Sequence, residues 1–123
     1  MAIPAALNGA YFITVRHRSS IETTSAAPVS FATTPVNYNF STSATQAFGD
    51  NLRDKNGVFL IWGGDINQDG IVDGSDMNPV DNSATAVTFG YVTEDANGDG
   101  IVDSGDMNIV DNNSTAIIMS YLP

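Results

Sequence analysis

The sequence contains no cysteine, which excludes a disulfide framework, a thiol nucleophile and a thiolate metal site. It lacks any apolar run long enough to span a bilayer, so we expect no membrane insertion. Its first twelve residues have neither the basic region nor the continuous apolar region of a secretory signal. A secreted domain without disulfides can instead be stabilised by a bound metal ion.

Basic residues are few and unevenly placed. The chain has four Lys and Arg residues against fourteen Asp and Glu, and the formal net charge is −10. All four bases lie before residue 56, whereas residues 65–123 hold eleven acidic residues and no base. No run of bases is available to neutralise phosphates, so we expect no nucleic-acid partner. The acidic half is either a solvated face or a cation site.

The overall composition indicates an exported, β-rich protein. Charged residues make up only 15% of the 123 residues, and the other polar residues are mostly Ser, Thr and Asn. The length suits a single compact domain over residues 1–123, with a β-rich half (1–62) and an acidic half (63–123). We expect an extracellular or cell-surface location, in a bacterium.

The acidic half is an internal repeat. "DINQDGIVDGSD" at 65–76 is followed by "DANGDGIVDSGD" at 95–106, and identical residues continue as far as Tyr91 and Tyr121. The repeated units are therefore 65–94 and 95–123. Each unit is typical of a loop, a short helix and a strand. The predicted helices are "SDMNPVDN" and "GDMNIVDN", and the predicted strands are "ATAVTFGYV" and "TAIIMSYL".

Each acidic string has the spacing of a calcium-binding loop. Oxygen-bearing side chains stand at positions 1, 3, 5, 9 and 12, a backbone carbonyl is available at position 7, and a Gly at position 6 permits the sharp turn. Ca²⁺ takes six to eight oxygen ligands, so the pattern predicts two bound Ca²⁺ ions. The alternatives are a turn-rich acidic loop without metal, or Mg²⁺. The predicted ligands are Asp65, Asn67, Asp69, the Ile71 carbonyl, Asp73, Asp76, Asp95, Asn97, Asp99, the Ile101 carbonyl, Asp103 and Asp106.

Paired D-x-N-x-D-G-x-x-D-x-x-D loops, each followed by a short helix, resemble the dockerin family over roughly residues 63–113. The resemblance implies two Ca²⁺ ions, an F-hand-like loop–helix arrangement and docking onto a cohesin-type partner protein. The chain departs from the family in three respects. Its helices carry no Lys or Arg, which dockerin recognition faces usually have, Pro79 stands inside the first helix, and a β-like run follows each helix.

The first half has the alternation of short strands. The runs "AYFITVRHR", "PVSF", "PVNYNF" and "GVFLIW" are separated by turn-forming residues, and "TSATQAF" suits a helical turn or a strand. Together with the strands after the two helices, about seven short strands result, as in a sandwich. The predicted fold is mostly β: a β-sandwich of immunoglobulin-like or jelly-roll type with two EF-hand-like calcium loops, each followed by a short helix.

Nothing in the sequence indicates an enzyme. His17 is the only histidine, no Ser-His-Asp set or phosphate loop is present, and the carboxylates cluster as metal ligands. Two non-catalytic functions remain. One is an extracellular structural subunit, stiffened by calcium, whose copies assemble into a fibre or surface layer by exchanging terminal strands. The other is a dockerin-like module that binds a cohesin-type protein.

Self-assembly would use the arginines of the first half and the apolar end of the chain. Residues 115–123 are apolar on both alternating faces, and the two halves carry opposite net charge. The arginines can equally be solvated strand residues. The candidate interface residues are Phe12, Arg16, Arg18, Ile117, Ile118, Met119, Tyr121 and Leu122.

Overall fold

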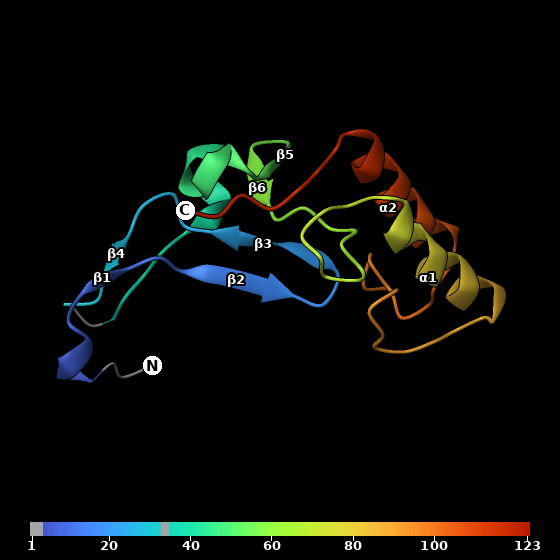
Figure 1. The fold of residues 1–123 in the computed structure, drawn as a ribbon, viewed down its shortest axis with the longest axis horizontal. Coiled ribbons are helices and arrows are strands. Elements are labelled where there is room, and N and C mark those ends of the chain that lie inside the picture. The colour runs from blue at the N-terminus through green and yellow to red at the C-terminus, as the bar shows by residue number, and fades with distance from the viewer. Residues whose placement is uncertain (1–3, 33–34) are drawn as a thin grey trace. The chain divides into compact units, whose positions relative to one another are not determined.

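The computed structural model describes residues 4–32 and 35–123 (Figure 1). In chain order the elements are the 3-10 helix η1 (Ala5–Leu7), the strands β1 (Ala10–Tyr11), β2 (Thr14–His17), β3 (Ser20–Thr24) and β4 (Val29–Ser30), the 3-10 helices η2 (Phe40–Thr42), η3 (Ala44–Gln46) and η4 (Phe48–Asp50), the strands β5 (Arg53–Lys55) and β6 (Val58–Leu60), and the helices α1 (Gly74–Thr85) and α2 (Ser104–Thr115). None of the described helices is long and apolar enough to cross a membrane.

The strands pair only in twos, so the predicted β-sandwich is wrong. β1 pairs with β4, β2 with β3 and β5 with β6, which gives three separate two-stranded sheets. A sandwich requires two larger sheets with apolar inner faces. Here the strands are two to five residues long. The longest, β3, buries the polar side chains of Ser20, Thr23 and Thr24, so no apolar sheet face forms.

Local hydrogen bonds interrupt two of the predicted strands. The run at 10–18 divides into β1 and β2 because the Ile13 N–H donates to the Ser25 hydroxyl at 3.0 Å. Residues 35–39 form no strand. The Asn39 side chain instead caps η2 by accepting from Ser41 N–H, and the Tyr38 hydroxyl donates to the Gln46 carbonyl.

The predicted strands after the two helices are reduced to single bridges. Val87 and Ile117 adopt left-handed φ of 55° and 54°, immediately beyond the C-cap residues Ala86 and Ala116 of α1 and α2. Each turn is closed by a hydrogen bond back into its helix, of the kind found at helix C-termini. The chain therefore changes direction there, and only Phe89↔Ile101 and Ile71↔Met119 pair in antiparallel bridges.

The chain divides into two compact units. Unit 1 comprises Met1–Val15, Thr23–Leu60 and Tyr121–Pro123, and unit 2 comprises Arg16–Glu22 and Ile61–Ser120. The β2–β3 hairpin thus contributes its tip, residues 16–22, to unit 2.

The interior of unit 1 is small and partly polar. Ala47 and Leu52 are its buried apolar residues, and Thr23, Thr24 and Ser25 are buried with them. Aromatic contacts supplement this core, in the pairs Tyr11–Phe31 at 5.3 Å, Phe12–Phe48 at 6.5 Å and Tyr38–Phe40 at 4.8 Å between ring centroids. Such pairs stabilise a fold beyond the area they bury.

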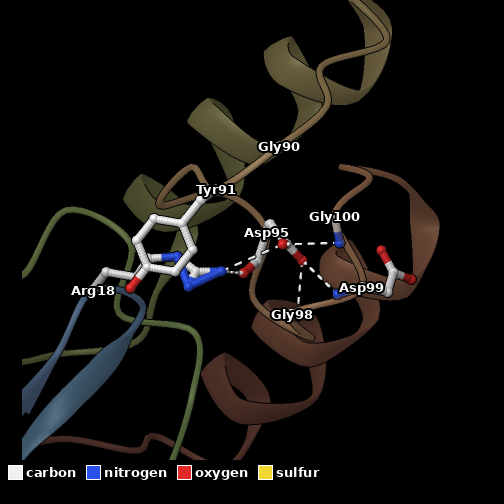
Figure 2. Close-up of a pocket in the computed structure, with 7 residues that line it drawn as sticks. All are labelled: Arg18, Gly90, Tyr91, Asp95, Gly98, Asp99 and Gly100. Carbon is white, nitrogen blue, oxygen red and sulfur yellow. Dashed lines mark hydrogen bonds and ion pairs between the residues drawn. The ribbon is translucent and has the colours of Figure 1, made fainter.

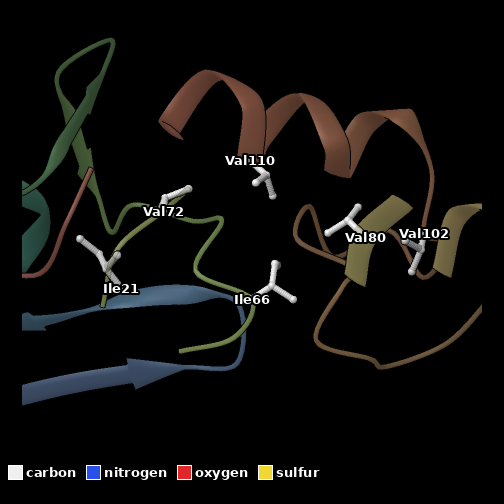
Figure 3. Close-up of a cluster of buried hydrophobic side chains, with 6 residues drawn as sticks. All are labelled: Ile21, Ile66, Val72, Val80, Val102 and Val110. Carbon is white, nitrogen blue, oxygen red and sulfur yellow. The ribbon is translucent and has the colours of Figure 1, made fainter. Parts of the chain in front are cut away.

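Unit 2 has the aliphatic core, and this core joins the repeat to the hairpin tip (Figure 3). Val80 comes from α1 and Val110 from α2, while Val72 and Val102 anchor the two acidic loops. The hairpin tip supplies Ile21 to the same cluster. Each acidic loop is therefore held in the core by its Val, whereas the preceding Ile71 and Ile101 are exposed.

Val80→Ala should destabilise the protein by about 2 kcal/mol, because a fully buried side chain leaves a cavity when it is shortened. Val58→Ala is the control, since Val58 is 50% exposed and its truncation should cost less than about 0.5 kcal/mol. Urea denaturation of both variants under the same calcium conditions measures the difference. Equal losses would contradict the assignment of the core to unit 2.

Candidate metal centre

The two acidic loops, loop 1 (65–76) and loop 2 (95–106), each lead directly into a helix. The side chain of Asp73 caps α1 by accepting from Ser75 N–H at 2.7 Å, and Asp103 caps α2 by accepting from Gly105 N–H at 2.6 Å. The bonds to the backbone and side chain of Ser75 lower the pKa of Asp73. The residue at position 9 of each loop therefore has a role in starting the helix.

The carboxylate at position 12 ties the two ends of each loop together. Asp76 is fully buried and accepts from Ile66 N–H at 2.7 Å, Asn67 N–H at 3.0 Å and Asp73 N–H at 2.9 Å. The equivalent Asp106 is also fully buried and accepts from two backbone N–H groups. These bonds complete a capping box at the start of each helix.

Side chains at positions 3 and 5 shape each loop through short-range hydrogen bonds. In loop 1, Asn67 Oδ1 accepts from Asp69 N–H at 2.8 Å, and Asp69 Oδ1 accepts from Ile71 N–H at 3.0 Å. Loop 2 repeats both bonds at 2.7 and 2.9 Å. The bridge to residues 118–120 uses the Gly70 carbonyl and the Val72 N–H. The Ile71 carbonyl, the predicted ligand at position 7, takes no part in that bridge.

The carboxylate at position 1 of loop 1 is incompletely paired. Asp65 is 2% exposed, and its Oδ2 accepts from Gly70 N–H at 3.1 Å. Its buried Oδ1 has no hydrogen-bond partner among the described residues. Burial raises the pKa of Asp65, and the negative charges of Asp76 and Asp69 add to that rise. The Gly70 N–H opposes it, and the Asp69 N–H does so to a smaller extent. A buried carboxylate oxygen without a partner is costly, and a cation would satisfy it.

The carboxylate at position 1 of loop 2 is fully paired (Figure 2). Oδ1 of Asp95 accepts from Gly98 N–H at 2.8 Å and Asp99 N–H at 3.1 Å. Its Oδ2 accepts from Gly100 N–H at 3.1 Å and from the Arg18 guanidinium at 3.3 Å. The same residues, with Gly90 and Tyr91, line an open pocket of about 300 Å³.

The residues of both loops fit calcium by their chemistry. Each loop offers four carboxylates, one carboxamide and the backbone carbonyl at position 7, and all of these are hard oxygen donors. In residues 4–32 and 35–123, however, no three acidic or histidine side chains converge as a ready-made metal site. The carboxylates face backbone N–H groups instead. The fit therefore rests on the donor set and on the unpaired oxygen of Asp65.

The predicted interface residues are divided between the two units. Phe12, Tyr121 and Leu122 belong to unit 1, and the other five belong to unit 2. Within unit 2, Arg16 forms an ion pair with Glu22. Ile118 and Met119 lie beside loop 1, where the Ile118 carbonyl accepts from Val72 N–H.

Sequence reasoning missed the contribution of the hairpin tip and Tyr91 to loop 2. Arg18 was a candidate for contact with another subunit, but its guanidinium lies 4.0 Å from the Tyr91 ring centroid of its own chain. The only signal in the sequence was the repetition of an aromatic residue at positions 91 and 121.

No family model, no curated protein and no solved structure matches the chain, so these comparisons assign it to no family. The resemblance to dockerins therefore stays a prediction from residues 63–113.

Substitution of the first carboxylate should have opposite effects in the two loops of the metal-free protein. Asp65→Asn removes a buried charge without a full set of partners and should raise the free energy of unfolding by about 1 kcal/mol. Asp95→Asn is the matched change, and it should lower that free energy by about 2 kcal/mol because the Arg18 charge loses its partner. Denaturation in excess chelator measures both. A loss of stability in both variants would contradict the unequal pairing of the two loops.

Proposed function

We propose that the chain is a non-catalytic extracellular protein that binds two Ca²⁺ ions, one in each acidic loop. The observation that carries this proposal is the buried, unpaired Oδ1 of Asp65 within a loop of oxygen donors spaced for calcium. The repetition of the same donors in loop 2 supports a second ion. When bound, the ions supply positive charge to two clusters of four carboxylates each.

Calcium would act on a unit that carries almost no positive charge of its own. Unit 2 contains Arg16 and Arg18 against twelve acidic residues, whereas the two bases and two acidic residues of unit 1 balance. The net charge of −10 therefore belongs to unit 2. Because both loops are fastened to the core through Val72 and Val102, an ion in each loop would also hold the aliphatic core together.

Calcium should raise the thermal stability of the protein, with two ions bound per chain. At free calcium about 100-fold above a site's Kd, each site adds about 2.7 kcal/mol to the free energy of unfolding. Calorimetric melts in calcium, in magnesium and in chelator, with isothermal titration for the stoichiometry, measure this. An unchanged midpoint on chelation, or equal stabilisation by magnesium, would contradict the proposal.

We further propose that the calcium-loaded unit 2 docks onto another protein through the outer faces of α1 and α2. Asn78, Asp81, Asn82 and Thr85 follow the i, i+3, i+4, i+7 spacing of one helix face, and all four are exposed. The residues at the equivalent positions of α2 are identical and are also exposed: Asn108, Asp111, Asn112 and Thr115.

The packed positions of the same helices are a mixture. Asp76, Met77 and Val80 of α1 are identical to Asp106, Met107 and Val110 of α2, as packing requires, whereas Pro79, Ser83 and Ala84 correspond to Ile109, Asn113 and Ser114. Identity at four exposed positions is not required by packing, and it favours recognition by a partner. The acidic and amide groups of the exposed helix faces suit a partner surface that presents hydrogen-bond donors and basic side chains, as a cohesin-type protein could.

Two findings make strand exchange a weaker explanation than docking. Residues 118–120 are already bonded to loop 1 of their own chain, through Val72 N–H to Ile118 O at 2.8 Å and Ser120 N–H to Gly70 O at 2.7 Å. Donating this segment to a neighbour would break those bonds. The charge difference also falls between a neutral unit and a strongly acidic one, so the attraction expected between oppositely charged halves is lost.

Docking should require calcium and at least one intact helix face. Asp81→Lys or Asp111→Lys alone should leave binding to purified cohesin-type domains within about threefold, and the double variant should lose it, because either face suffices. Binding is measured by surface plasmon resonance with and without chelator, with Asp54→Lys as the control on unit 1. Light scattering of the calcium-loaded protein tests the alternative, since fibres or oligomers without any binding to the domains would favour self-assembly.

A further inference from the structure

Arg18 belongs to the hairpin tip, but all its polar contacts are with the segment that enters loop 2. Its Nε donates to the Val92 carbonyl at 2.8 Å, and its Nη2 donates to the Asp95 carbonyl at 2.9 Å and to Asp95 Oδ2 at 3.3 Å. The Tyr91 ring covers the guanidinium (Figure 2). Only 13% of the Arg18 side chain is exposed, so this ion pair is shielded from solvent.

The described hydrogen bond between the same hairpin tip and loop 1 involves no charged group. There the Gln68 side chain donates to the His17 carbonyl at 2.8 Å. Asp65, which corresponds to Asp95, receives one N–H on Oδ2, and its Oδ1 has no partner among residues 4–32 and 35–123. Two loops with the same donor residues thus have different electrostatic surroundings. Within loop 2 the Gly98 and Asp99 N–H groups donate to Asp95 Oδ1, and among the described contacts a cation from outside the repeat reaches Asp95 and not Asp65.

We propose that Arg18 is a built-in counter-ion of loop 2 that makes the two calcium sites unequal, with loop 1 the tighter site and loop 2 the weaker one. The proposal rests on the calcium function proposed above. A Ca²⁺ ion at loop 1 gives a partner to an oxygen that has none. At loop 2 the first carboxylate is already neutralised and fully hydrogen-bonded, and the nearby guanidinium repels a second cation. Arg18 in turn holds loop 2 folded when calcium is absent.

A purely structural role for Arg18 makes the opposite prediction about affinity. If the side chain only fixed the shape of loop 2, removing it would disorder the ligands and weaken calcium binding there. If it acts as a counter-ion, removing the charge while keeping a hydrogen-bond donor strengthens binding at loop 2. The sign of the change in affinity therefore separates the two roles.

The order of affinities is tested by isothermal titration of chelator-treated protein with calcium alone. Asp69→Ala and Asp99→Ala change the same position in each loop, so each variant leaves one loop functional. The described hydrogen bonds of the Arg18 side chain are with Val92 and Asp95, so neither change removes one of them. Loop 1, which stays functional in Asp99→Ala, should bind calcium about tenfold more tightly than loop 2, which stays functional in Asp69→Ala. Equal affinities, or the reverse order, overturn the proposal.

The role of the charge is tested in the Asp69→Ala background. Arg18→Gln should tighten calcium binding at loop 2 about tenfold, and Arg18→Lys, which keeps the charge, should change it less than about twofold. Arg16→Gln is the matched control, because Arg16 lies two residues before Arg18, in β2, and its ion pair is with Glu22. In the Asp99→Ala background, Arg18→Gln should leave loop 1 unchanged.

Thermal melts give a second readout that a structural role would not move in the same way. Arg18→Gln should lower the midpoint of the metal-free protein, and saturating calcium should remove most of that difference. A similar loss in both states, or weaker calcium binding in Arg18→Gln, overturns the proposal.

Circular dichroism checks that the variants fold. If Arg18→Gln does not fold without metal, the order of calcium affinities in Asp69→Ala and Asp99→Ala still tests the proposal. A wild-type chain that binds no calcium overturns the proposed function as well, whereas two equal sites overturn only this inference.

Discussion

Unit 2 depends on one fully buried carboxylate in each acidic loop. Asp76 and Asp106 are out of contact with water, and a buried charge must be compensated by donors within the protein. Those donors are backbone N–H groups from the beginning of the loop and from the residue that caps the helix. The loop cannot open, and the helix cannot begin elsewhere, without leaving this charge unpaired. With an aliphatic cluster of only six buried residues, such polar constraints define much of the fold.

The internal repeat duplicates the loops but not their surroundings. Residues 16–22 join unit 2 from outside the repeat. Their His17 carbonyl accepts from the Gln68 amide of loop 1, and their Arg18 guanidinium donates to Asp95 of loop 2. A duplicated sequence can therefore produce two sites with different electrostatics. This difference lies in Asp65 and Asp95, residues of the same type at the same position of the pattern. It is set partly within loop 2, where the Gly98 and Asp99 N–H groups donate to Asp95 Oδ1, and partly by the contact of Arg18 from outside the repeat.

The parts of the structure that follow from local signals could be predicted from the sequence. Each helix begins where an Asp is followed three residues later by another Asp, and both form within their repeat units. The turns at Val87 and Ile117 could not be predicted, because a β-branched residue is strongly disfavoured at left-handed φ and normally continues a strand. The run at 10–18 was mistaken for one strand because its alternation does not reveal that a Ser side chain takes the N–H of Ile13.

The candidate site was predictable in its residues and not in its arrangement. The twelve proposed ligand positions lie in two loops, as their spacing requires, yet their carboxylates are engaged by backbone N–H groups that no spacing rule identifies. The contact between Arg18 and Asp95 joins residues 77 positions apart. The sequence near Arg18 carries no signal of a partner at that separation, so Arg18 was expected to lie in solvent or at a subunit contact.

Each loop pairs with the segment that follows the helix of the other repeat unit, and this affects the order of folding during synthesis. Loop 2 is bridged to residues 88–90, which emerge from the ribosome just before it, so this pairing can form as soon as the loop is made. Loop 1 is bridged to residues 118–120, which are synthesised almost fifty residues after Val72. Pairing over so long an interval costs more chain entropy and is slower. Loop 1 is therefore translated first but gains its bridge last. Its acidic residues stay exposed until residues 118–120 have been synthesised and unit 2 has folded.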